Sequence, residues 1–257
     1  MLIRHIVNIV SVIAGILLIW AVSFNKFPWW SLIVLAFLWL FITTYGVANI
    51  RSGYFLKSLS RNPHVSGKRI AITFDDGPDQ NTLEILKVLD KYKVKGTFFC
   101  IGKQVEKHPE ILKKIIEAKH IVGNHTFSHD KLIDLYSTDK FTQEITEADK
   151  IIKKVSGQKP LLFRPPYGIT NPKIARAVKN TGHIVIGWNK RSFDTTIPSE
   201  KMILKRVTKN LKNGDVILLH DTKTITVTVL EQLLLFLQKN NFTTVTVDEL
   251  FSIQAYV

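Results

Sequence analysis

The segment RIAITFDDGP, residues 69–78, changes within a few positions from an apolar run to two adjacent carboxylates followed by Gly-Pro. The apolar part is short and contains several β-branched residues, which is typical of a buried strand. Two neighbouring carboxylates are more than the following helix needs at its N-terminus, where Asp79 or Asn81 can act as a cap. Asp75 and Asp76 therefore mark the end of a strand and either a plain turn or a candidate functional site.

The rest of the chain repeats this change from strand to helix. Short apolar runs alternate with stretches of helical period, as in a parallel sheet whose strands are joined by crossover helices. An open doubly wound sheet and a (β/α) barrel both fit this α/β alternation, and both place reactive residues at the carboxyl ends of strands. We expect strands near residues 69–75, 96–101, 120–124, 161–164, 183–188, 215–220 and 243–247, and helices near 81–92, 103–118, 139–155, 172–180, 199–212 and 226–240.

Two histidines follow the third expected strand in the segment HTFSH, residues 125–129. Histidines at positions i and i+4 point to the same side of a helical turn, so we expect both rings to reach one ion. With one carboxylate they would form a zinc site of the catalytic type, which keeps an open position for water. The alternative is a pair of structural histidines. The other histidines show no such pairing, and we interpret them as structural.

Reactive residues also follow later strands. Residues 164–168 read RPPYG, in which two prolines and a glycine fix a turn that can hold a backbone N–H ready for an oxyanion. Arg164 can orient a carboxylate. Further on, Asp194 precedes the segment LLHD at 218–221, where His220 at a strand end beside an acid is a candidate proton donor. A plain proline turn and a core histidine are the alternative interpretations.

In these segments the chain resembles the polysaccharide deacetylase family, also called the NodB-homology family or carbohydrate esterase family 4. The resemblance covers about residues 68–250 and implies a distorted (β/α) barrel. It also implies a metal-dependent hydrolase that removes N-acetyl, and in some members O-acetyl, groups from glycans. Five motifs of the family occur in order: TFDDGP at 73–78, HTFSH at 125–129, RPPYG at 164–168, Trp188 with Asp194, and LLH at 218–220.

The resemblance implies roles in proton transfer for four of these residues. Asp75 would be the general base, and Arg164 would hold it in place. His220 would be the general acid that protonates the leaving amine, oriented by Asp194. These roles suit the chemistry, because an acetamide is a poor electrophile with a poor leaving group. Its hydrolysis needs an activated water, a polarised carbonyl and an acid.

The resemblance further implies a metal site and a substrate site. The protein ligands of one divalent ion, Zn²⁺ in preference to Co²⁺ or Ni²⁺, would be Asp76, His125 and His129. The backbone N–H of Tyr167 would help to form an oxyanion hole. The substrate would contact Pro166, Tyr167, Trp188 and Leu218. Arg191 and Thr195 stand where many relatives have an acid and a second Trp, which indicates a differently shaped substrate groove.

The resemblance leaves several functions open. The leading expectation is a membrane-anchored N-deacetylase acting on an N-acetylated glycan, such as peptidoglycan or a chitin-like polymer, or on a glycolipid. An O-acetyl esterase or another amide hydrolase on the same scaffold is the first alternative. A catalytically silent glycan-binding protein is the second, although the presence of both Asp75 and His220 argues against it. No nucleic-acid partner is expected, because the basic residues are scattered over amphipathic segments.

The N-terminal part contains two long uncharged runs, residues 6–24 and 28–50, of 19 and 23 residues. Each is long enough to cross a bilayer core of about 30 Å as a helix. A cleaved signal peptide is the alternative for the first run. The expected organisation is a two-helix transmembrane hairpin at 1–50, a juxtamembrane linker at 51–67 and the catalytic domain at 68–257.

The charge distribution bears on the side of the membrane. The 257 residues carry 35 Lys and Arg against 21 Asp and Glu, and residues 1–74 hold seven of the basic residues and no acidic one. Six of the seven lie outside the expected hairpin turn, with Lys26 alone in it. The positive-inside rule then favours a cytoplasmic catalytic domain, whereas the family resemblance favours the cell envelope. A lipid-linked sugar at the cytoplasmic face would reconcile the two, and the side stays open.

Overall fold

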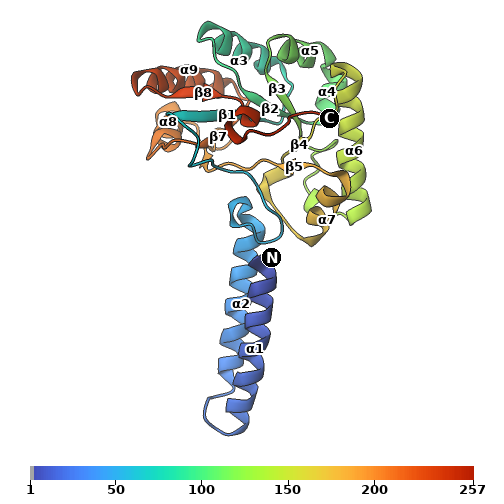
Figure 1. Ribbon diagram of the computed structural model, residues 1–257, viewed down its shortest axis with the longest axis vertical. Coiled ribbons are helices and arrows are strands. Elements are labelled where there is room, and N and C mark those ends of the chain that lie inside the picture. The colour runs from blue at the N-terminus through green and yellow to red at the C-terminus, as the bar shows by residue number, and fades with distance from the viewer. Residues whose placement is uncertain (1–2) are drawn as a thin grey trace.

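The computed structural model describes residues 3–257 and places an α/β domain at one end of a helical hairpin (Figure 1). The hairpin consists of α1 (Ile3–Ser23) and α2 (Trp30–Ala48). The other helices are α3 (Gln80–Lys91), α4 (Gly102–Lys107), α5 (Pro109–Glu117), α6 (Thr138–Ser156), α7 (Pro172–Thr181), α8 (Glu200–Thr208), α9 (Thr224–Lys239) and α10 (Val247–Phe251), with short 3-10 helices η1 (Ile50–Ser52), η2 (Ile133–Leu135) and η3 (Pro166–Gly168). The strands are β1 (Arg69–Asp75), β2 (Thr97–Cys100), β3 (Ile121–Asn124), β4 (Leu162–Phe163), β5 (Ile184–Val185), β6 (Lys190–Arg191), β7 (Val216–His220) and β8 (Thr243–Val245).

The strand pairs are parallel, as the alternation of strands and helices predicts. The order along the sheet is β5-β4-β3-β2-β1-β7-β6, and β8 pairs with the first residues of β1. Within residues 3–257 the end strands β5 and β6 do not pair with each other, so the sheet curls without closing. This is the distorted (β/α) barrel expected from the motifs.

Alternation along β1 separates the two hydrophobic cores and places the first carboxylate. Ile70, Ile72 and Phe74 belong to one core, which packs against α3, α5 and α9. Ala71 belongs to the other core, which fills the concave side with residues of β4, β5 and β7. Because side chains in a strand alternate between its faces, Asp75 lies on the same face as Ala71.

Differences from the expected elements have local causes. The helix expected at 103–118 is two helices, because Pro109 has no N–H to continue α4 and instead begins α5. The helix expected at 199–212 ends at Thr208. Strand β6 and helix α10 were not expected, since elements this short give no measurable periodicity.

The hairpin is fastened to the α/β domain through the segment that follows it. Gly46 of α2 packs against the ring of Tyr54, where a Cβ atom would overlap the ring. The carbonyl of Val47 accepts a hydrogen bond from the N–H of Thr170, at 3.0 Å. Leu59 forms a parallel bridge with Ile186, next to β5. Residues 51–67, expected as a juxtamembrane linker, therefore include positions packed against the α/β domain.

Candidate active site

The first two candidate residues lie at the carboxyl end of β1, beside the end of β7. Asp75 and His220 are register partners in the β1–β7 ladder, so the strand pairing alone brings them to the same edge of the sheet. Asp76 has a φ of 79°, in the left-handed region. This turn directs the chain out of the strand, and the Asp76 carboxylate lies beside the two candidate histidines.

Asp76, His125 and His129 form a compact cluster of potential metal ligands. Oδ1 of Asp76 lies 3.5 Å from Nε2 of His125 and 3.5 Å from Nε2 of His129. One ligand atom from each residue lies within 4.8 Å of the others. A tetrahedral ion with ligands at about 2.1 Å separates them by about 3.4 Å, so the spacing fits a divalent ion.

The two histidines are brought together by a loop rather than by a helix. The helical turn expected for residues 125–129 is wrong, because the segment is irregular and both Thr126 (φ 66°) and His129 (φ 50°) are left-handed. The carboxylate of Glu144 on α6 holds this loop by accepting the backbone N–H groups of Phe127 and Ser128, at 3.1 and 2.7 Å. Hydrogen bonds to a distant helix, rather than a helical turn, thus bring the rings of His125 and His129 together.

The pKa shifts of the cluster describe it without a metal ion. Burial acts to lower the pKa of His125, but the charges of Asp75 and Asp76 raise it. Asp76 and His129, in contrast, are held in the forms that bind a metal. Nδ1 of His125 lies 2.7 Å from the carbonyl oxygen of Arg164, so a hydrogen on Nδ1 leaves the lone pair of Nε2 directed at the cluster. Burial and the charge of His125 lower the pKa of His129 to about 4, which keeps this ring neutral near pH 7. Burial acts to raise the pKa of Asp76, but the hydrogen bond and charge of His125 outweigh it and lower the pKa below its ordinary value.

Asp75 is held by a buried arginine. Oδ1 of Asp75 accepts a hydrogen bond of 2.6 Å from Nη1 of Arg164, whose side chain has no exposed surface. The same guanidinium donates to the hydroxyl of Thr73 at 2.9 Å and to the carbonyls of Ile186 and Gly187 at 3.0 Å. The other oxygen of Asp75 lies 3.8 Å from Nε2 of His125, on the metal-ligand side. Asp75 is therefore fixed beside the ligand cluster without being part of it.

Asp194 contacts both the ring and the backbone of His220. Oδ1 of Asp194 lies 2.7 Å from Nδ1 of His220, and Oδ2 accepts the backbone N–H of His220 at 2.8 Å. The hydroxyls of Ser192 and Thr226 also donate to this carboxylate. Burial acts to lower the pKa of His220, but the hydrogen bond and charge of Asp194 raise it above its ordinary value. Nδ1 is occupied, so Nε2 is the nitrogen left for proton exchange.

The residues expected to contact substrate lie around the turn at η3. Tyr167 has a φ of 59°, and its ring centroid is 4.8 Å from that of His129. Pro166 is buried in the same turn. The ring of Trp188 lies against Gly168, and both Trp188 and Leu218 belong to the core on the concave side. These four positions thus adjoin the ligand cluster or the core behind it.

Sequence reasoning did not identify a buried polar chain behind the histidine loop. Asn124 accepts the N–H of Thr126 at 2.8 Å and donates to Asp149 at 2.7 Å. Asp149 in turn lies 3.2 Å from Nε2 of His183. The sequence signal that could have indicated this chain is Asp149, an acid at a position where the helical period of α6 predicts a buried, apolar residue.

Asp221 was noted only as an acid next to His220, but it shapes the turn after Asp76. Its carboxylate lies where a side chain at Gly77 would be, so the glycine of the TFDDGP motif is required for space. The hydroxyl of Thr82 donates to Asp221 at 2.6 Å. Burial raises the pKa of Asp221 to about 7, although that hydrogen bond opposes the shift.

Known proteins share this sequence pattern and fold. A family model for polysaccharide deacetylase matches residues 62–186. A peptidoglycan-N-acetylglucosamine deacetylase of Bacillus cereus is 38% identical over 193 residues, which are 71% of this chain and 88% of that protein. The peptidoglycan-N-acetylmuramic acid deacetylase PdaC of Bacillus subtilis is 35% identical over 71% of this chain and 38% of its own length.

Solved structures agree with the sequence comparison. The crystal structure of the Bc1960 peptidoglycan N-acetylglucosamine deacetylase, bound to a naphthalenyl N-oxidanyl-benzamide, superposes with a TM-score of 0.72 and 30% identity. The match covers 77% of this chain and 94% of that one. Identity at this level, over nearly the whole length of two relatives, extends well beyond the five motifs. The chain therefore belongs to the polysaccharide deacetylase family and is an enzyme of that class.

Proposed function

We propose that this enzyme removes N-acetyl groups from an N-acetylated glycan of the cell envelope, with one divalent metal ion and Zn²⁺ as the preferred ion. The named activities of the relatives, on peptidoglycan N-acetylglucosamine and N-acetylmuramic acid, support this substrate class. The observation that carries the proposal is the placement of Asp75 and His220. They are register partners at a sheet edge that also holds a three-residue ligand cluster.

Asp76, His125 and His129 would hold the ion. When bound, a divalent ion supplies Lewis acidity, which lowers the pKa of water and polarises a carbonyl. Asp75 accepts the proton of the attacking water, and Arg164 keeps its carboxylate in place. His220 donates a proton from Nε2 to the leaving amine nitrogen, while Asp194 stabilises the charged ring. The Tyr167 N–H stabilises the oxyanion, and Pro166, Trp188 and Leu218 bound the space for the acetyl group.

The N-terminal helices support a further part of the proposal, membrane attachment. Both α1 and α2 are long and apolar enough to cross a bilayer, with a mean hydropathy of 2.5 and 2.1. In this proposal residues 1–50 anchor the enzyme, residues 51–67 connect the anchor to the catalytic domain, and residues 68–257 form that domain. A cleaved signal sequence is the alternative for helices near an N-terminus. A reporter fused after Val257 would identify the side of the membrane that holds the catalytic domain.

Acetate release by the full chain in detergent tests the activity. The substrates are N-acetylglucosamine oligomers, peptidoglycan and acetylated xylan, each with zinc or a chelator. We expect release from an N-acetylated substrate that the chelator abolishes. Asp75→Asn should lower kcat by about 10²-fold or more while zinc still binds, because Asp75 is not in the ligand cluster. Asp90→Asn, on the exposed face of α3, is the matched control and should keep full activity.

The outcomes separate the parts of the proposal. Release from acetylated xylan alone would replace the amide substrate by an ester. Full activity of Asp75→Asn would overturn its role as the base. If zinc does not bind to the wild-type chain, measured by calorimetry, the ligand assignment is wrong.

A further inference from the structure

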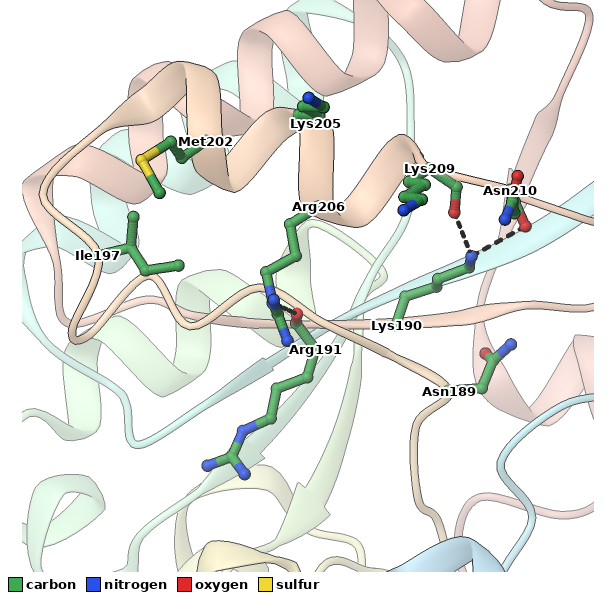
Figure 2. Close-up of a pocket in the computed structure, with 9 residues that line it drawn as sticks. All are labelled: Asn189, Lys190, Arg191, Ile197, Met202, Lys205, Arg206, Lys209 and Asn210. Carbon is green, nitrogen blue, oxygen red and sulfur yellow. Dashed lines mark hydrogen bonds between the residues drawn. The ribbon is translucent and has the colours of Figure 1, made fainter.

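Two adjoining pockets lie outside the catalytic cluster, beside the end of the hairpin. One, of about 520 Å³, lies between β6 and α8 (Figure 2). The other, of about 470 Å³, lies between residues 45–51 at the end of α2 and residues 188–193. Asn189, Arg191 and Arg206 line both pockets. We call the combined feature the basic groove.

The basic groove is lined by an excess of positive charge. No Asp or Glu among the described residues lines it, and its cations are Arg51, Lys190, Arg191, Lys205, Arg206 and Lys209. Within residues 3–257, Lys190 alone of these six has a carboxylate at ion-pair distance, that of Asp215 at 3.7 Å. Figure 2 shows Lys190 turned away from Arg191, and its Nζ donates to the carbonyls of Lys209 and Asn210 at 2.6 and 2.9 Å. The other five cations have no carboxylate at ion-pair distance in the part of the chain that the structure describes.

Two of these cations are held as a pair around one aromatic ring. The guanidinium carbons of Arg191 and Arg206 lie 4.6 and 4.3 Å from the ring centroid of Phe193. Nε of Arg206 donates to the carbonyl of Arg191 at 3.0 Å, which fixes the pair. Nε of Arg191 is buried and has no hydrogen-bond partner among the described residues. Phe193 itself has a left-handed φ of 59°, a strained conformation for an aromatic residue.

Such a pair favours a bound counter-charge. Two like charges around one ring repel each other, and burial together with the charge of Arg206 lowers the pKa of Arg191, although the charges of Asp75 and Asp194 act to raise it. An anion between the guanidinium groups would remove the repulsion and satisfy the buried Nε–H. Guanidinium groups bind phosphate and carboxylate oxygens through paired hydrogen bonds, and several cations favour a multiply charged phosphoryl group.

The position of the basic groove links the membrane helices to the catalytic cluster. It is lined by Tyr45 and Ala48, the last part of the apolar helix α2. It is also lined by Trp188, whose ring centroid lies 5.6 Å from the guanidinium carbon of Arg191. That same ring lies against Gly168, in the turn beside the candidate oxyanion donor. A ligand in the groove would therefore lie beside the end of the apolar helix α2 and beside Trp188, which adjoins the turn at η3.

Building on the proposed deacetylase activity, we propose that the basic groove binds the phosphoryl group of a lipid-linked glycan substrate. The N-acetylated sugar would enter the active site past Trp188, and the hydrocarbon chain would follow α2. A groove for an uncharged polymer would not require five cations without a carboxylate at ion-pair distance.

The test compares two substrates on the full chain in nanodiscs of phosphatidylcholine. One is a prenyl pyrophosphate-linked N-acetylglucosamine, and the other is an uncharged alkyl glycoside of the same sugar with similar chain length. In Arg191→Gln/Arg206→Gln the ratio of kcat/KM between the charged and uncharged substrates should fall about 10- to 100-fold, as expected for lost hydrogen bonds to a charged group. Lys201→Gln, exposed on α8 outside the groove, should leave the ratio unchanged. An unchanged ratio in the double variant, or an equal fall in Lys201→Gln, overturns the proposal.

A binding measurement separates this proposal from the deacetylase activity. Calorimetry with a prenyl pyrophosphate without sugar, in the same nanodiscs, should show binding that the double variant weakens about tenfold or more. Inorganic pyrophosphate should bind the wild type more weakly, because it lacks the chain. Equal affinity for both probes overturns the lipid part of the proposal. If the wild type binds the prenyl pyrophosphate but releases no acetate from either substrate, the deacetylase function fails while the anion site stands.

Discussion

The protonation state of His220 depends on a single carboxylate. Asp194 raises the pKa of His220 above its ordinary value, so the ring stays protonated over a wider pH range. A general acid must be protonated, so kcat/KM should fall as the pH rises through this raised pKa. In Asp194→Asn the pKa of His220 drops, and the alkaline limb should move to lower pH. Activity at neutral pH should also decrease by about 10²-fold or more.

The pH–rate profile and an NMR titration of His220 measure this effect. Ser192→Ala is the control, because it removes one hydrogen bond to Asp194 and leaves the carboxylate beside the ring. Its alkaline limb should keep its position. An alkaline limb that does not move in Asp194→Asn would mean that another group donates the proton.

Arg164 is the residue whose loss should destabilise the fold most. It is fully buried and pairs with Asp75, so Arg164→Met leaves a buried carboxylate without its partner. Breaking a buried ion pair in this way costs about 3–5 kcal/mol. Urea unfolding should therefore show a much lower free energy of unfolding for Arg164→Met. The double variant Arg164→Met/Asp75→Asn should be less destabilised than the sum of its parts, because no unpaired charge remains.

The matched control is Arg176→Met on α7, where the arginine is exposed and donates only a long hydrogen bond to Thr138, of 3.3 Å. Its free energy of unfolding should change by less than about 0.5 kcal/mol. Similar losses at both arginines would show that the pairing of Asp75 does not matter for stability.

At the scale of elements, the turn at η3 depends on a glycine for two separate reasons. Gly168 has a φ of 71°, and a Cβ atom there would overlap the ring of Trp188. Gly157 at the end of α6 has a φ of 76° but nothing within 4 Å of its Cβ position. Gly157→Ala should therefore cost about 1 kcal/mol, from backbone strain alone. Gly168→Ala should cost about 1–3 kcal/mol more, because Trp188 must move.

Thermal unfolding and acetate release of Gly157→Ala and Gly168→Ala distinguish backbone strain from steric overlap with Trp188. In Gly168→Ala the displaced turn should also misplace the Tyr167 N–H and lower kcat, whereas Gly157→Ala should keep it. Equal destabilisation by the two alanines, with equal activity, would show that the space beside Trp188 is not tightly filled.

Helices and strands were predictable from sequence where their hydrophobic pattern extends over many residues. Site residues were predictable where they lie at the carboxyl ends of such strands. The sequence predicts β1 and β7, and parallel pairing then places Asp75 beside His220. The conformation of the loops was not predictable. Thr126 and Tyr167 are left-handed although neither is glycine, and the loop that follows Thr126 is held by Glu144 of the distant helix α6. The i, i+4 spacing of the two histidines therefore predicted that their rings lie together, but the helical turn behind that prediction does not form.

At the scale of the whole molecule, the helical hairpin projects from the α/β domain and contacts it at one end. In Figure 1 the turn between α1 and α2 is far from the domain, while the end of α2 lies against it. The contact at this end includes the packing of Gly46 against the ring of Tyr54. Thr170 also donates hydrogen bonds to the carbonyls of Gly46 and Val47, at 3.3 and 3.0 Å. If α1 and α2 span the bilayer, this contact fixes the height and tilt of the active site above the membrane surface.

Gly46→Val should loosen that contact, because a branched side chain cannot fit against the Tyr54 ring. Spin labels at Lys26→Cys in the hairpin turn and Lys150→Cys on α6 should then give a broader distance distribution in nanodiscs than the same pair without the valine. Gly15→Ala is the control within the hairpin, since its Cβ would meet Leu35 at an ordinary contact distance of 3.9 Å. Its distribution should stay narrow. A distribution equally broad before and after Gly46→Val would mean that the domain already moves freely on the hairpin, and the basic groove would then have no fixed position relative to a lipid-linked substrate.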